Sequence, residues 1–258
     1  IVGFLTYYEY TGDKAFIEKV YGASLDYLKL WEIGENNLVV HREGSWDWPD
    51  WGKKADMTAI ENAWVYYALS SVEKMAGVLG EDKDISFITE RKNAISKGYE
   101  ALWTEDGFKS EDVKKPDDRA NALAVLAGLA KKEQYSTIKN VLTTTKNSSP
   151  YMEYYVLEAL CKMGKYEVAY DRIKDRYADM VYRLALLQVK SQADADDIFQ
   201  EVFIRLVKNI EKLQSWEHVK AWLIKVTINC SRKHFAKFEI KNFLPVEEIE
   251  ETAKTVNL

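Results

Sequence analysis

The sequence concentrates aromatic rings and carboxylates in one short stretch, GSWDWPDWG at positions 44–52. The side chains that could act together there are Trp46, Asp47, Trp48, Asp50 and Trp51. Indole faces stack on the apolar C–H face of a pyranose ring, and carboxylates accept hydrogen bonds from sugar hydroxyls. Paired carboxylates also flank the scissile bond in most glycosidases. The stretch therefore favours a loop that contacts sugar.

A structural role fits the same residues. The indoles could plug the end of a helical barrel, while Asp47 and Asp50 could cap the helix expected to begin at Met57. Buried Trp is common, and Asp is a favourable N-cap residue. The residue types alone leave both interpretations open.

A second group of polar residues lies further along the chain. A helix is expected over Ala193–Ile210, with Asp194 or Asp196 as its N-cap. One side of this helix is an apolar stripe that faces a core. The other side carries Asp197, Gln200, Glu201 and Arg205.

The next helical pattern, Trp216–Phe238, ends in a cluster of basic residues. Its members are Lys220, Lys225, Arg232, Lys233, His234, Lys237 and Lys241. The aromatic residues Trp216, Trp222, Phe235 and Phe238 lie among them. Cations beside exposed rings suit a nucleic-acid backbone and unstacked bases. An ordinary solvated helix end is the alternative, because cations also favour helix C-termini.

The composition is that of a globular protein, with 258 residues, 47% of them hydrophobic and 30% charged. A net charge of −5 argues against indiscriminate nucleic-acid binding by the whole molecule. The two cysteines, Cys161 and Cys230, lack metal-ligand spacing and indicate a reducing compartment. We expect no cofactor, no metal site and no membrane span, and a cytoplasmic location.

Helical periodicity dominates the chain and predicts an all-α fold. The expected helices are Ala15–Trp31, Met57–Leu79, Ile85–Leu102, Arg119–Lys131, Tyr135–Leu142, Tyr151–Lys162, Tyr166–Tyr177, Ala178–Lys190, Ala193–Ile210 and Trp216–Phe238. Long loops alternate with short turns, a pattern typical of αα-hairpins in series. Loops at one end of such a scaffold are where binding sites are built.

The pattern of the sequence changes near Tyr177, where the aromatic-rich long loops stop. We place domains at 1–177 and 178–240, followed by a tail at 241–258. No linker separates the domains, because DRIKDRYADMVYRL reads as one continuous helix. The chain opens on IVGFLTYYEYTGD without Met, inside an apolar helical pattern, which indicates a natural start upstream.

Four stretches of the first domain carry a family resemblance: WDWPDWG, TAIENAWVYYAL, DDRANALAVLAGLA and SPYMEYYVLEALCKMGKYEVAYDRIKDRY. Together they resemble the catalytic (α/α)6 toroid of family 78 glycoside hydrolases, the α-L-rhamnosidases. The resemblance implies a rhamnose subsite lined by Trp48, Asp50 and Trp51 and supported by Asp47. It also brings Tyr151 and Glu153 near the mouth of the toroid, where Glu153 is a further candidate substrate-binding residue. Arg119 and Asn121 match there too, and we interpret these two as caps or loop anchors.

The resemblance also implies a catalytically incomplete fragment. In the family, the general acid lies in a segment upstream of this region, with no counterpart before Ile1. The general base lies in a T-[IL]-W-E stretch shortly after the helix that matches YEVAYDRIKDRY, and no LWE follows Tyr177. Inverting hydrolysis needs both carboxyl groups.

The second domain resembles region 2 of extracytoplasmic-function sigma factors of the sigma-70 superfamily. The stretches are DADDIFQEVFIRLVKNI and SWEHVKAWLIKVTINCSRKHF. The resemblance implies that Asp197, Gln200, Glu201 and Arg205 dock on the clamp helices of the RNA polymerase β′ subunit. It also implies that a second set of residues lies near promoter −10 DNA: Trp216, Trp222, Asn229, Arg232, Lys233 and His234.

Three hypotheses for the whole chain follow. The first is a rhamnosidase-like enzyme fragment with an added helical domain. The second is a transcription initiation module whose N-terminal part recognises sugar. The third is an artificial joining of two unrelated coding fragments.

Overall fold

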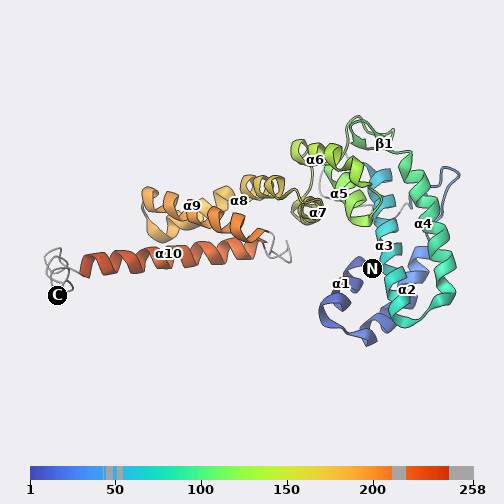
Figure 1. Ribbon diagram of the computed structural model, residues 1–258, viewed down its shortest axis with the longest axis horizontal. Helices are drawn as coiled ribbons and strands as arrows, with labels where there is room; N and C mark the ends of the chain where they lie inside the picture. Colours follow the sequence, from blue (N-terminus) through green and yellow to red (C-terminus); the bar gives the residue numbers. More distant parts are fainter. Residues whose placement is uncertain (43, 45–48, 51–54, 211–218, 244–258) are drawn as a thin grey trace, which may run out of the picture. The chain divides into compact units, whose positions relative to one another are not determined.

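The structure of the protein is a computed structural model (Figure 1). It describes all residues except 43, 45–48, 51–54, 211–218 and 244–258, and only the backbone of 236–243. The chain forms two compact units, Ile1–Val168 and Ala169–Leu258. Each unit is described by itself.

The first unit is a series of αα-hairpins. Its helices are α1 (Val2–Thr11), α2 (Lys14–Lys29), α3 (Met57–Leu79), α4 (Ile85–Glu100), α5 (Asp118–Ala127), α6 (Tyr135–Thr144) and α7 (Pro150–Lys162). Helices α1, α3, α5 and α7 pack successively against one another, and α2, α4 and α6 pack against them (Figure 1). This arrangement confirms the predicted hairpin series.

The core of this unit lies between the hairpin layers. Ile17, Leu69, Val72, Met75 and Ile88 are fully buried in it. Burying a side chain of this size contributes about 1.5–3 kcal/mol relative to leaving it exposed. The apolar stripes thus hold the helices together, while the loops at the ends of the helices remain available for polar residues.

The helix termini follow from local sequence. Asp13 caps α2 by accepting from the Phe16 N–H at 3.0 Å. Asp56 caps α3 by accepting from the Ala59 N–H at 3.1 Å. Helices α1, α3 and α5 all end at a glycine with positive φ, where a side chain would be strained.

Two minor elements lie in the loops of this unit. A short β-hairpin pairs β1 (Trp103–Thr104) with β2 (Gly107–Phe108). Ile33 and Val39 form a single antiparallel bridge in the loop after α2. One-turn 3-10 helices at Asp82–Asp84 and Lys132–Gln134 lead into α4 and α6.

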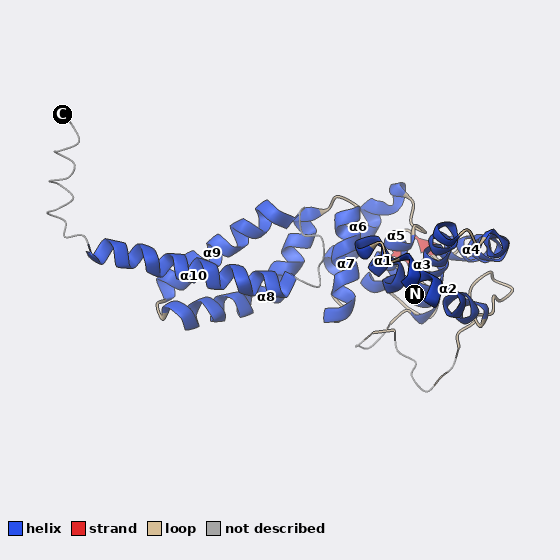
Figure 2. Cartoon of the chain, turned by 90° about the horizontal axis from the view of Figure 1, so that it is seen from below, coloured by secondary structure: helices blue, strands red, loops and turns tan. Residues whose placement is uncertain are grey.

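The second unit is a small helical bundle. It consists of most of α8 (Tyr166–Val189) together with α9 (Gln192–Asn209) and α10 (Val219–Phe243). The three helices lie side by side (Figure 2). Between α8 and α9, the rings of Tyr182 and Phe199 meet edge to face, with their centroids 6.1 Å apart. Ile198, Val202 and Leu206 of α9 are buried, as the apolar stripe predicts.

The start of α9 corrects one prediction. Ser191 is the N-cap, and its side chain accepts from the Asp194 N–H at 3.4 Å. Asp194 and Asp196 therefore lie inside the helix and do not cap it. Ser is also a preferred N-cap residue, and Ser191 lies two residues before Ala193, the expected start of the helix.

Helix α8 crosses the division between the units without a break, as DRIKDRYADMVYRL predicts. The expected helices Tyr166–Tyr177 and Ala178–Lys190 are thus a single helix. Among the described residues, no helix is both long enough and apolar enough to cross a membrane.

Candidate functional site

The carboxylate of Asp50 lies buried at the centre of a polar cluster in the first unit. Asp50 as a whole residue is only 3% exposed. One oxygen, Oδ2, accepts from the Ser149 backbone N–H at 2.8 Å and from Arg119 Nη1 at 3.3 Å. The other oxygen, Oδ1, is buried and has no hydrogen-bond partner among the described residues. Buried carboxylate oxygens are normally paired, so this one is free to accept a hydrogen bond from a ligand.

Arg119 fixes the position of Asp50 from the first turn of α5. The guanidinium is fully buried and donates to Asp117 through Nε at 2.9 Å and Nη2 at 2.5 Å. Burial by itself lowers the Arg119 pKa, but the hydrogen bonds and charge of Asp117 outweigh it and raise the pKa overall. The guanidinium therefore stays charged and holds both carboxylates.

Glu153 lies in the first turn of α7, next to this cluster. It is 5% exposed and accepts a hydrogen bond from the Ser148 hydroxyl. Ser149, the N-cap of α7, donates its backbone N–H to Asp50. The structure thus brings Asp50, Arg119 and the start of α7 together, from segments far apart in sequence. Asp47, Trp48 and Trp51 lie outside the described residues.

The structure also decides which aspartate caps α3. Asp56 does so, and its other oxygen accepts from the Ser110 N–H at 2.7 Å. The alternative role of Asp50 as this cap is therefore wrong. The signal was present in the sequence, because Asp56 directly precedes the first helical residue.

Asn121 is a loop anchor, as interpreted from the sequence. Its fully buried side chain accepts from the Phe108 N–H and donates to the Phe108 carbonyl, both at 2.9 Å. It also donates to the Asp117 carbonyl at 2.9 Å. Three hydrogen bonds from one amide fix β2 against the start of α5.

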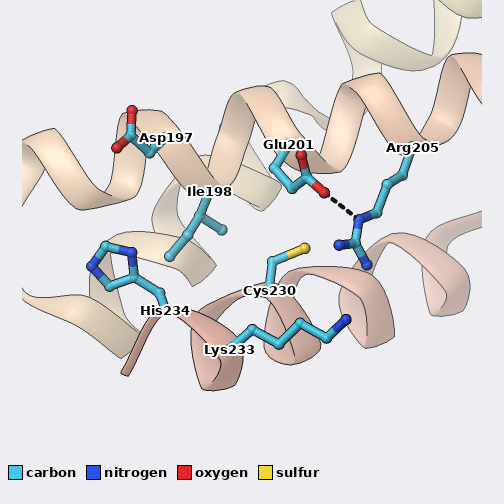
Figure 3. A pocket seen from close by; sticks show the side chains of 7 residues that line it. All are labelled: Asp197, Ile198, Glu201, Arg205, Cys230, Lys233 and His234. Carbon is cyan, nitrogen blue, oxygen red and sulfur yellow. Dashed lines mark hydrogen bonds and ion pairs between the residues drawn. The ribbon is translucent and has the colours of Figure 1, made fainter. Parts of the chain in front are cut away.

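In the second unit, side chains of α9 and α10 line an open pocket of about 300 Å³ (Figure 3). Its lining consists of Asp197, Ile198, Glu201, Arg205, Cys230, Lys233 and His234. Glu201 accepts from Arg205 Nε at 2.7 Å, one turn along α9. Burial raises the pKa of the Cys230 thiol, which disfavours its ionised form.

The predicted polymerase-contacting and DNA-contacting residues occupy the surface of this unit. Asp197 and Gln200 are exposed, and Glu201 and Arg205 are half-buried. On α10, Asn229, Arg232 and Lys233 are exposed, and Trp222 is half-buried. His234 Nε2 lies 3.0 Å from Asp194 Oδ1. Trp216 lies outside the described residues.

Comparison with known families finds a match in each part of the chain. Residues 2–183 match the bacterial α-L-rhamnosidase 6 hairpin glycosidase domain, and the chain belongs to this family. Residues 173–238 match sigma-70 region 2. The two matches overlap within α8.

Two relatives illustrate these matches. A crystal structure of a GH78 family rhamnosidase from Bacillus sp. GL1 has a similar fold, with a TM-score of 0.56 and 21% identity. The similarity covers 69% of this chain and 20% of that one. The ECF RNA polymerase sigma factor SigE of Mycolicibacterium smegmatis is 36% identical over 61 residues, which is 24% of this chain and 23% of SigE. The chain thus spans about a fifth to a quarter of these relatives.

Proposed function

We propose that the hairpin unit binds a rhamnose-type sugar at the Asp50 cluster and does not hydrolyse it. The Asp50 Oδ1 oxygen carries this proposal, because it is buried and has no hydrogen-bond partner in the described part of the chain. A sugar hydroxyl would supply the missing donor, and Arg119 and Ser149 hold the carboxylate ready for it. The loop residues Asp47, Trp48 and Trp51 would complete the subsite by the family resemblance.

The absence of hydrolysis follows from the course of the chain after Tyr177. Where the family resemblance expects the general base, this chain continues through α8 into residues that match sigma-70 region 2. Without a general base at that place, the chain lacks one member of the opposed acid–base pair that bond cleavage requires.

Calorimetric titration with L-rhamnose tests the binding proposal. We expect binding by the wild type and at least about tenfold weaker binding by Asp50→Asn, since a charged acceptor of a buried hydrogen bond is lost. The matched control is Asp106→Asn, at an exposed position in the β-hairpin turn. Equal affinity of both variants, or no binding by the wild type, would contradict the proposal. Release of nitrophenol from an aryl rhamnoside, abolished by Asp50→Ala, would contradict catalytic incompleteness.

A second function is favoured for the region 2 unit, namely docking on RNA polymerase. The supporting observation is the polar face of α9, where Asp197, Gln200 and the Glu201–Arg205 pair reach solvent. We expect an isolated β′ clamp-helix fragment to bind the chain and Glu201→Lys to abolish binding. Asp196→Lys is the matched control, with the same charge change about 140° away around the helix. Equal loss in both variants would point to general charge repulsion and contradict a specific dock.

Promoter contact by the same unit is tested separately. Arg232 and Lys233 are exposed on α10 and suit phosphate contacts. Binding of a single-stranded −10 oligonucleotide should weaken with salt, and Lys233→Ala should reduce the salt slope by about one. An unchanged salt slope would show that Lys233 does not contact the phosphates of the oligonucleotide.

The third hypothesis, an artificial joining of two coding fragments, is favoured by the overlap of both family matches inside one uninterrupted helix. Long sequencing reads across the codons for Lys174–Arg183 decide it. Reads that diverge after Tyr177 would support joining, and reads that all cross this region in frame would establish a natural fusion.

A further inference from the structure

The open pocket between α9 and α10 combines an apolar base with charged side chains of both signs (Figure 3). Its most buried lining residues are Ile198 and Cys230, which are 3% and 6% exposed. The charged residues around them are half-buried or exposed, so their charged groups remain accessible to a ligand. An apolar surface with a few convergent polar groups is typical of binding sites for small molecules.

Two cations meet at one end of the pocket. Figure 3 shows the Lys233 side chain extending towards the Arg205 guanidinium. Burial raises the Cys230 pKa, and the charges of Arg205 and Lys233 oppose this effect, so both cations lie near that thiol. Arg205 donates through Nε to Glu201, and its Nη1 and Nη2 have no hydrogen-bond partner among the described residues. Guanidinium N–H groups beside an ammonium group suit a carboxylate ligand.

The same pocket offers two acceptors for positive charge. Glu201 gives Oε1 to Arg205, and its other oxygen has no partner in the described part of the chain. Asp197 lies one turn earlier on α9, at the end of the pocket where His234 also lies (Figure 3). His234 pairs with Asp194 at 3.0 Å, which leaves Asp197 without an ion pair to any described residue. The four residues between the two acceptors correspond to about 6 Å along the helix.

One small molecule can satisfy all of these groups. We propose that the pocket binds a free amino acid with a positively charged side chain, and that this ligand controls docking of the unit. The α-carboxylate of the ligand pairs with Arg205 and Lys233, and its α-ammonium group pairs with Glu201. The four methylenes of a lysine ligand span the distance of about 6 Å to Asp197, over the apolar base of the pocket.

The pocket overlaps the polar face of α9 that the proposed function assigns to RNA polymerase. Asp197, Glu201 and Arg205 belong to both. A bound amino acid occupies the charged groups that the β′ clamp helices would contact, so the amino acid and the clamp compete. The competition rests on the proposed docking function, whereas binding of the amino acid does not.

Calorimetric titration of the full chain with L-lysine tests the site. We expect at least about tenfold weaker binding of L-norleucine, which lacks the side-chain ammonium group, and of cadaverine, which lacks the carboxylate. Asp197→Asn should abolish the preference for L-lysine over L-norleucine, and Arg205→Gln should abolish the preference over cadaverine. The matched controls are Asp196→Asn and Lys208→Gln, at exposed positions of α9 outside the pocket. Both should bind L-lysine as the wild type does.

The outcomes separate the amino-acid site from its effect on docking. No binding of L-lysine by the wild type, or equal affinity of Asp197→Asn and Asp196→Asn for it, would overturn the inference. At ten times its Kd, L-lysine should weaken binding of the β′ clamp-helix fragment about tenfold. Unchanged affinity for the fragment would overturn the competition and leave the amino-acid site standing. A chain that binds L-lysine but never the fragment would overturn the docking proposal alone.

Discussion

Asp50 and Asn121 are both buried polar side chains, but only one of them is satisfied. Both N–H groups and the oxygen of the Asn121 amide are hydrogen-bonded, in three bonds of 2.9 Å. Asp50 leaves Oδ1 without a described partner. An unsatisfied buried oxygen costs about 1–3 kcal/mol. Asn121 therefore serves stability, and Asp50 is the better candidate for binding.

Replacement of Asn121 should be costly for stability. Asn121→Ala leaves the buried Phe108 N–H and carbonyl without their partner, so we expect a loss of about 2–4 kcal/mol in unfolding free energy. Urea unfolding followed by circular dichroism measures it. Asn140→Ala, at an exposed position of α6, should stay within about 0.5 kcal/mol of the wild type. Similar losses in both variants would contradict the anchoring role.

The cysteines should be unreactive in the folded chain. Burial, with a smaller contribution from Glu158, raises the Cys161 pKa to about 12. At pH 8, only about 10⁻⁴ of this thiol is then ionised, and the thiolate is the reactive form. Ellman's reagent should react with Cys161 and Cys230 at least about a hundredfold more slowly in buffer than in urea. Because the pKa is raised, reactivity should increase up to high pH; a plateau below pH 9 would contradict this prediction.

At the scale of elements, apolar periodicity predicts the helices well. The expected Met57–Leu79 is α3 to the residue, because Gly80 and the apolar pattern mark its end. The strands β1 and β2 were not predicted, since two residues are too few to show alternation. At the site, Asp50 was predicted from residue type, as a hypothesis that stands untested. Its pairing with Arg119 joins positions 69 residues apart, and local sequence carries no signal for such a contact.

Packing of α4 depends on the lack of a side chain at Gly98. A Cβ there would lie 2.6 Å from the Asn37 carbonyl oxygen. We expect Gly98→Ala to lower the unfolding free energy by about 1–3 kcal/mol, despite the better helix propensity of Ala. Gly77→Ala is the matched control, because a Cβ at that position of α3 meets nothing within 4 Å. It should stabilise by up to about 1 kcal/mol. A change of the same sign in both variants would contradict the packing argument.

At the scale of the whole molecule, two compact units with separate buried cores should unfold separately. Leu206→Ala, in the core of the second unit, should lower one unfolding transition by about 2–5 kcal/mol. Leu69→Ala, in the core of the first unit, should lower the other. Hydrogen exchange at rising urea concentrations assigns each transition to its helices. A joint shift of both transitions by either variant would show a single cooperative unit.

Helix α8 also sets an order of events during synthesis. Its first turn, Tyr166–Val168, belongs to the first unit, and its remaining turns belong to the second. At 5–20 residues per second, a ribosome needs roughly 5–18 s to add residues 169–258, which leaves the first unit time to fold. Forming the first turn is the unfavourable step of helix growth. The nascent second unit therefore elongates from a helical end that its predecessor has already ordered.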